Sequence, residues 1–207
     1  MHRSIFSTAI TIAAPAVFLL AACSEQRAPT DVSRSTTQGV ALSKEVIGPG
    51  HTAGIVAHDR CDPETFNATK FGPGTCVKEG PTTFPEFFAE VVATHAATGW
   101  RLTPENATAQ FGSDLLGNNV GGEVHTFTPV RAFGGSIIPE LNEAIGNPVV
   151  AEECKNLDDD DKVASGSQYR IEAEELAAAV DGDGIARVQC CIHPWMRTEI
   201  HLHGAAN

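Results

Sequence analysis

Near its C-terminus the chain reads RVQCCIHPWMR, residues 187–197. This stretch spaces Cys190, His193 and Met196 three residues apart, directly after a short strand-like run. A thiolate, an imidazole and a distant thioether are donors of the trigonal copper sites that take two His, one Cys and a weak axial Met. The spacing therefore predicts three ligands of one copper ion on a single tight loop.

Such a site needs a second imidazole, which this loop lacks. Residues 121–128 read GGEVHTFT and supply a candidate in His125, followed by an alternating pattern typical of a strand. Zinc is the alternative for a Cys-x-x-His pair, but it would need a second close-spaced pair of ligands, and none is evident. We therefore expect one copper ion per chain, bound by His125, Cys190, His193 and Met196.

Residues 190–196 resemble the ligand loop of the cupredoxins, and the closest form is the short amicyanin-type loop, Cys-x-x-His-Pro-Phe-Met. Residues 119–127 resemble the first ligand strand of that plastocyanin- and azurin-like family, where an Asn precedes a His by a few residues. The similarity covers residues 100–202. It implies an all-β, cupredoxin-like Greek-key β-sandwich with a type 1 (blue) copper centre.

The resemblance also implies roles around the ligands. His193 is expected at the protein surface, with Pro194 and Trp195 forming the apolar port through which electrons pass. Burial of Trp195 against the sheet is the alternative. Asn119 resembles the residue whose hydrogen bonds lock the copper loop, and Asn118 is an equally placed rival.

The first residues resemble an export signal rather than a folded segment. A basic start and an apolar run over residues 5–20 lead to Leu-Ala-Ala-Cys, which ends at Cys23. A transmembrane anchor is the alternative, but the run is short and contains Pro15. We expect a lipoprotein signal peptide over 1–22 and a lipidated Cys23 with a flexible tether over 23–45. The protein would then be an exported bacterial lipoprotein at the outer membrane, facing the periplasm.

The composition narrows the class of partner. Losing residues 1–22 removes one of the 14 basic residues, Arg3, and none of the 26 acidic ones, which leaves a formal net charge of −13. A chain this acidic repels nucleic acid and attracts basic surfaces. A basic redox protein is therefore a candidate partner, although solubility explains the charge equally well.

Six cysteines are present, and two already have expected roles in Cys23 and Cys190. The remaining four are Cys61, Cys76, Cys154 and Cys191. An even number in an exported protein predicts two disulfides, and three connectivities are open. Cys61–Cys76 is the local choice, which leaves Cys154–Cys191 as the second bridge.

The pattern of apolar, polar and turn residues divides the remaining chain into segments of predicted loop, helix and strand. Residues 46–80 read as a loop, and residues 83–94 as a helix that starts with a Thr83–Glu86 capping box and packs an apolar stripe on a sheet. From residue 100 short β runs alternate with turns. The expected strands are 100–102, 107–111, 114–116, 124–130, 168–172, 185–189 and 199–203, with one helical turn at 174–179. The expected domains are an N-terminal loop and helix extension over 46–99 and a cupredoxin domain over 100–207.

These expectations favour a carrier of single electrons. An enzyme is not expected, because copper oxidases and nitrite reductases need a second such domain and further His-rich motifs. Copper binding or delivery in copper homeostasis is one alternative, although the chain has only two Met and no Met-rich tract. A non-redox interaction module of the same fold is the other.

Overall fold

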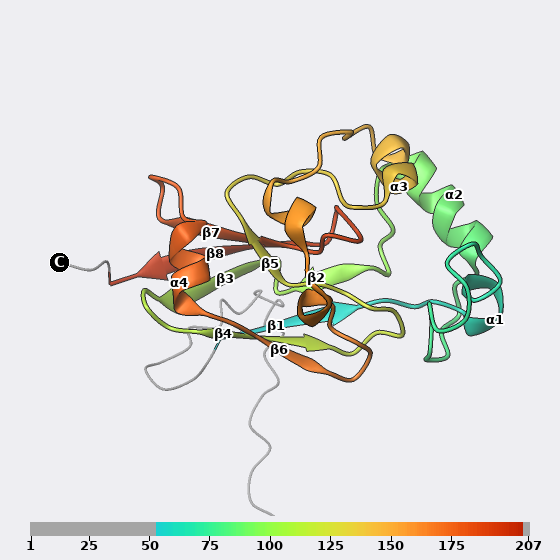
Figure 1. Ribbon diagram of the computed structural model, residues 1–207, viewed down its shortest axis with the longest axis horizontal. Coiled ribbons are helices and arrows are strands. Elements are labelled where there is room, and N and C mark those ends of the chain that lie inside the picture. The colour runs from blue at the N-terminus through green and yellow to red at the C-terminus, as the bar shows by residue number, and fades with distance from the viewer. Residues whose placement is uncertain (1–52, 205–207) are drawn as a thin grey trace, which may run out of the picture. The chain divides into compact units, whose positions relative to one another are not determined.

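The computed structural model describes residues 53–204, which form two facing sheets with helices at their ends and edges (Figure 1). The expected signal peptide 1–22, the lipidated Cys23 and the tether to residue 45 lie outside the described residues. Within the described part, no helix is long and apolar enough to cross a membrane.

The first sheet has the strand order β2-β1-β4-β6. Its strands are β1 (Ala53–His58), β2 (Arg101–Thr103), β4 (Leu115–Asn119) and β6 (Gln168–Ile171). β1 pairs in parallel with β4, whereas the β1–β2 and β4–β6 pairs are antiparallel. This sheet is therefore mixed.

The second sheet has the order β3-β8-β7-β5 and is mixed as well. It contains β3 (Asn106–Gln110), β5 (Thr128–Val130), β7 (Ile185–Gln189) and β8 (Arg197–His203). β3 and β8 are parallel, and the other two pairs are antiparallel. Two mixed sheets, with few and short helices, make the fold a β-sandwich.

Alternating side chains of both sheets fill the space between them. In β4 the burial alternates along the strand, as expected for a strand with one face on a core. Gly117 of β4 is required by packing, since a Cβ there would lie 2.5 Å from the ring of Phe127. Leu115 and Ile200, one from each sheet, are fully buried.

The helices are α1 (Pro63–Phe66), α2 (Phe84–Thr94), α3 (Pro139–Ala144), α4 (Ala173–Ala178) and the 3-10 turns η1 (Glu153–Asn156) and η2 (Asp159–Asp161). In Figure 1, α1, α2 and α3 lie toward one end of the sandwich, α4 lies toward the other, and the two 3-10 turns lie between them. α2 starts at Thr83 with the capping box to Glu86. Its stripe packs on an aromatic cluster with Phe66 and Trp100, and Val92 at its end is 52% exposed.

The expectation of a loop over residues 46–80 was wrong for residues 53–58, which form β1. Gly54 and two Ala residues give this segment a weak strand signal. The hydrogen bonds come from strands far along the chain, β2 on one side and β4 on the other. Tertiary pairing thus outweighs local propensity here, and β1 lies inside the first sheet.

Candidate metal centre

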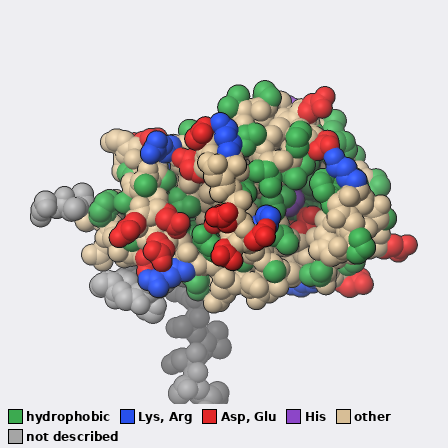
Figure 2. All heavy atoms as spheres, in the orientation of Figure 1, with side chains coloured by type: hydrophobic (Ala, Val, Ile, Leu, Met, Phe, Trp, Pro, Cys, Tyr) green, Lys and Arg blue, Asp and Glu red, His purple; other side chains and the backbone are tan. Residues whose placement is uncertain are grey.

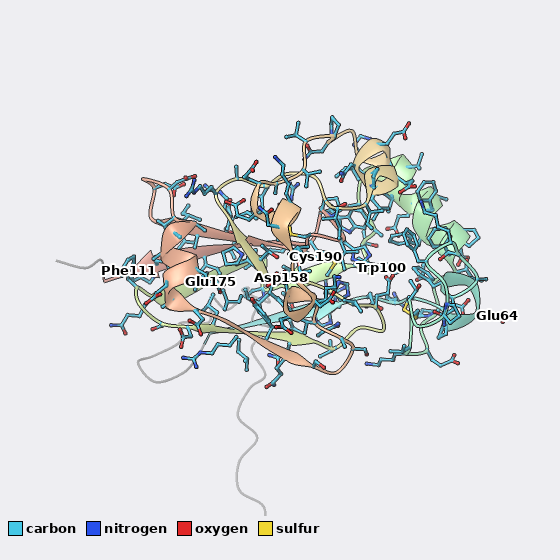
Figure 3. All side chains as sticks on the ribbon, viewed as in Figure 1. Glu64, Trp100, Phe111, Asp158, Glu175 and Cys190 are labelled. Atoms are coloured by element: carbon cyan, nitrogen blue, oxygen red, sulfur yellow. A yellow bond between two sulfur atoms is a disulfide. The ribbon has the colours of Figure 1, made fainter. Side chains whose placement is uncertain are left out.

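Three expected ligands meet inside the sandwich. Sγ of Cys190 lies 3.7 Å from Nδ1 of His125 and 3.9 Å from Nδ1 of His193. All three side chains are buried, and their donor atoms lie within 4.8 Å of one another. Figure 3 shows Cys190 at the centre of the molecule, just beyond the end of β7. One thiol and two imidazoles therefore converge on one point.

The spacing of these donors fits a metal ion. An ion in the plane of three donors, about 2.3 Å from sulfur and about 2.0 Å from nitrogen, holds sulfur and nitrogen about 3.7 Å apart. The two observed separations, 3.7 and 3.9 Å, match this value. The residues present thus suit a trigonal site of two His and one Cys.

The ligand loop closes through its own backbone. The N–H of Cys190 donates to the carbonyl of Met196 at 3.0 Å, and the N–H of Met196 donates to the carbonyl of His193 at 2.9 Å. Met196 is fully buried. The backbone of Met196 thus closes the loop, whereas the role of its sulfur as an axial ligand stays a prediction.

His125 reaches the site from an irregular segment, so the expected strand 124–130 was too long. Only Thr128–Val130 is regular strand, and His125 forms an isolated bridge with Val163. The backbone N–H of Thr126 points to Sγ of Cys190 at 3.5 Å, and its hydroxyl accepts from the N–H of Cys191 at 2.8 Å. Thr126 therefore joins the two ligand segments instead of continuing a ladder.

Asp59 was missed by the sequence analysis and holds the outer edge of His125. Its Oδ2 lies 2.9 Å from Nε2 of His125, and both side chains are almost completely buried. Its two oxygens also accept from the N–H groups of Gly122 and Glu123 at 2.8 and 3.0 Å. A proton held on Nε2 by a carboxylate leaves the Nδ1 lone pair free for a metal.

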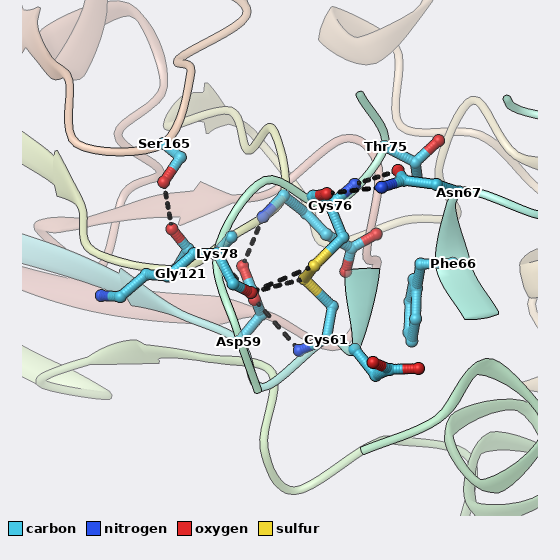
Figure 4. Close-up of a disulfide and its surroundings, with 12 residues drawn as sticks. Asp59, Cys61, Phe66, Asn67, Thr75, Cys76, Lys78, Gly121 and Ser165 are labelled. Carbon is cyan, nitrogen blue, oxygen red and sulfur yellow. Dashed lines mark hydrogen bonds between the residues drawn. A yellow bond between two sulfur atoms is a disulfide. The ribbon is translucent and has the colours of Figure 1, made fainter. Parts of the chain in front are cut away.

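The Gly121–Gly122 pair makes room for this carboxylate. A Cβ on Gly121 would overlap Asp59, and one on Gly122 would lie 2.7 Å from Sγ of Cys61. Figure 4 shows Asp59 and Gly121 next to the Cys61–Cys76 disulfide. In the sequence, the glycine pair before His125 was the one local indication that another segment packs closely against this turn.

Both expected disulfides are present, Cys61–Cys76 and Cys154–Cys191. The second ties η1 to the residue that follows Cys190. A further group of donors, Asp59, Cys61 and Glu123, is not a second metal site, because Cys61 is bonded to Cys76 and has no thiolate to offer.

Asn119 holds the turn that carries His125. Its side-chain N–H₂ donates to the carbonyls of Glu123 and Val163 at 2.7 and 2.8 Å, and its oxygen accepts from the N–H of Gly121. Asn118 instead bonds to a side chain of β6 and takes no part in this turn. The structure thus separates the two Asn residues that the sequence left equal.

His193 is not at the surface, which corrects the expectation from the resemblance. Its side chain is 3% exposed, because α2 places the ring of Phe87 edge-on against it, with ring centres 6.1 Å apart. Its Nε2 lies 3.6 Å from Oε2 of Glu123, and that oxygen accepts a hydrogen bond from the indole of Trp100. Each His ligand therefore has a buried carboxylate behind it.

The two residues expected to form an electron port have different surroundings. Pro194 is buried. Trp195 is half-buried, and its ring centre lies 5.7 Å from that of His193. Its Nε1 is buried and has no hydrogen-bond partner among residues 53–204.

The charges of the site are coupled. Burial alone would raise the pKa of Cys190, but hydrogen bonds from His125 and His193 outweigh it and hold that pKa well below its usual value. Burial alone would lower the pKa of His125, but Asp59 and Cys190 raise it to about 10. Burial raises the pKa of Glu123 despite the attraction of His193. The metal-free pocket thus favours a thiolate at Cys190 beside a protonated His125, and a metal bound at Nδ1 would displace that proton.

The structure is a sandwich of two facing mixed sheets that encloses a buried His-Cys-His cluster, a candidate metal centre. No family model matches the chain, and no curated protein matches it. Among solved structures the chain is similar to a novel purple cupredoxin from Nitrosopumilus maritimus, at 12% identity and a TM-score of 0.35. The likeness covers 72% of this chain and 98% of the other. A likeness this weak carries no argument about the site, which stands on its own geometry.

Proposed function

We propose that this chain is a type 1 copper protein that carries single electrons between redox partners. The observation that supports it is the convergence of the two Nδ1 atoms on Sγ of Cys190, with each Nε2 turned toward a carboxylate. This arrangement presents one thiolate and two imidazole lone pairs to the same point. When bound, copper supplies a one-electron couple that these ligands suit in both oxidation states.

The choice of copper over zinc rests on the donor set. Structural zinc sites take four strong ligands in a tetrahedron. Here the described residues gather three, His125, Cys190 and His193, at trigonal spacing. In the proposal Met196 adds the weak axial sulfur. The hydrogen bonds of Asp59, Asn119 and Thr126 hold the donors in place, so little has to move when the charge changes.

The proposal also covers the path that electrons take to the metal centre and the location of the protein in the cell. With Phe87 covering His193, Trp195 is the proposed path for electrons, because it is half-buried and close to that ligand. The chain is proposed to have a Greek-key connection of its strands. It would be exported, lipidated at Cys23, anchored at the outer membrane facing the periplasm, and paired with a basic redox protein. The proposal includes no catalysed reaction.

The first experiment adds Cu(II) to the purified chain and records its absorption and EPR spectra. An intense band near about 600 nm with narrow hyperfine splitting is expected from copper bound to a thiolate in a trigonal site. Cys190→Ser should abolish the band. His193→Gln should remove or shift it, whereas His201→Gln, on an exposed His of β8, should leave it unchanged. A faint, broad spectrum, or no stoichiometric copper, would contradict the proposal.

One observation favours a second candidate, copper binding for storage or delivery. Phe87 packs against His193 and leaves that residue only 3% exposed, and such limited access slows electron exchange. Stopped-flow reduction of the copper-loaded protein by ascorbate separates the two. Complete reduction within seconds supports the carrier, and reduction over hours supports storage.

A further inference from the structure

A large apolar cavity opens beside the candidate metal centre. Its volume is about 850 Å³, within the range of about 300–1,000 Å³ typical of small-molecule sites. Figure 2 shows hydrophobic side chains around a hollow on the side of the molecule that carries α2 and α3. The walls come from α1, α2, the start of α3 and the ligand loop. They include Phe66, Phe84, Phe87, Phe88, Leu141 and Ile192.

The cavity has a polar end. Glu123 and His193 line it, and they are only 7% and 3% exposed. Oε2 of Glu123 already accepts from Trp100 and faces His193. Its other oxygen, Oε1, has no hydrogen-bond partner in the described part of the chain. Among residues 53–204 only Nε1 of Trp195 is fully buried without a partner, so Oε1 of Glu123 keeps some access to the cavity and can accept from a molecule bound there.

The opposite end has an apolar rim. Phe71 and Ile137 line the cavity and are 50% and 38% exposed, although large side chains of this kind are usually covered. Lys70 and Glu140 form an ion pair between the segment after α1 and α3. The two walls of the cavity are thus linked at the surface while its interior stays apolar.

We propose that this cavity binds a neutral phenolic molecule, with its rings between the Phe side chains and its hydroxyl donating to Glu123. The aromatic walls favour flat rings, which gain from offset and edge-on contacts. The acceptor at the inner end favours a ligand that carries a donor. The formal charge of −12 and the buried carboxylate disfavour an anion. This inference goes beyond the proposed function, because the binding requires no copper.

The test is calorimetric titration of the full chain with 2-naphthol, in metal-free and in copper-loaded form. Saturable binding at one site per chain is expected in the metal-free protein. 2-Methoxynaphthalene has the same rings without the donor and should bind at least about tenfold more weakly, since the hydrogen bond to a charged group is lost. 1-Decanol keeps the hydroxyl on a linear chain and should also bind more weakly.

Two variants place the binding in this cavity. Ala68→Trp, at an exposed residue that lines it, should reduce 2-naphthol affinity at least tenfold, and Ile137→Trp provides the same block from the other wall. Ala93→Trp, on the exposed side of α2, is the matched control and should bind normally. Thermal melting shows whether each variant is folded.

Each remaining outcome overturns the inference or a stated part of it. Absence of saturable binding, or unchanged affinity in both folded blocking variants, removes the site. Equal affinity for 2-methoxynaphthalene removes the role of Glu123, and equal or tighter binding of 1-decanol replaces the phenol by a lipid chain. Because 2-naphthol binding is measured on the metal-free protein, its result is independent of the copper spectrum. Either test can therefore fail while the other succeeds.

Discussion

His125 and Asp59 are 66 residues apart in the chain and form a buried pair at 2.9 Å. Asp59 is acidic beyond its usual range. Burial alone would raise the pKa of Asp59. The hydrogen bond and charge of His125 and two backbone N–H groups outweigh burial, so that the pKa lies below its usual value. The carboxylate therefore stays charged, fixes the ring of His125 and increases the basicity of its other nitrogen. A partner of this kind affects metal affinity without touching the metal.

Asp59→Asn should lower copper affinity by about 10–100-fold, the usual effect of removing such a partner. The amide has no charge, and its N–H₂ would face the N–H donors of Gly122 or Glu123. Competition titration against a chelator measures the change. Asp160→Asn, at an exposed position in η2, is the matched control and should leave affinity unchanged. Equal affinities in the two variants would show that the pair has no role in metal binding.

At the scale of elements, α2 is the part that alters the surroundings of the centre. Phe87 is one of its two buried residues, 3% exposed, and its ring lies 4.5 Å from that of Trp100 and 5.9 Å from that of Trp195. The same ring covers His193. One helix thus adds to the core, separates a ligand from solvent and forms one wall of the cavity.

Phe87→Ala should lower the free energy of unfolding by about 3–5 kcal/mol, the usual cost of removing a buried aromatic ring. Denaturant unfolding of the metal-free protein measures it. Phe71→Ala removes a half-exposed ring and should cost less than about 1 kcal/mol. Similar losses in both variants would mean that α2 does not pack on the sandwich as described.

At the scale of the whole molecule, two disulfides connect distant parts of the chain around the centre. Cys61–Cys76 encloses the segment next to Asp59, and Cys154–Cys191 ties η1 to the ligand loop. The bridges span 15 and 37 residues. Since a bridge restricts the unfolded chain more when its loop is longer, the second should stabilise more.

Replacing Cys154 and Cys191 together by Ser should lower the free energy of unfolding by about 3–4 kcal/mol in the chain-entropy view. The double variant of Cys61 and Cys76 is the comparison and should lose somewhat less. Guanidinium unfolding followed by circular dichroism gives both values. A loss below about 1 kcal/mol for the longer bridge would contradict this account.

Patterns in the sequence predicted most of the local features of this protein. The Cys-x-x-His-x-x-Met spacing and the Gly-Gly-Glu-Val-His run named the three donors that the structure gathers, since ligands on one loop and one strand leave a short-range signal. The capping box predicted α2, and short β runs between turns predicted β7 and most of β8. The cysteine count predicted two disulfides, and the pairing chosen from the local spacing, Cys61–Cys76 with Cys154–Cys191, is confirmed.

Only the tertiary structure decided what surrounds those donors. It placed Asp59 behind His125, Glu123 behind His193 and Phe87 over the ligand loop, and it made residues 53–58 a strand. The three side-chain contacts join residues that are 66, 70 and 106 positions apart, and a lone Asp or Phe has no periodic pattern to mark it. The candidate metal ligands could be predicted because their spacing in the local sequence marks them. Their charge, their burial and their exposure to solvent depend on where distant segments of the chain pack.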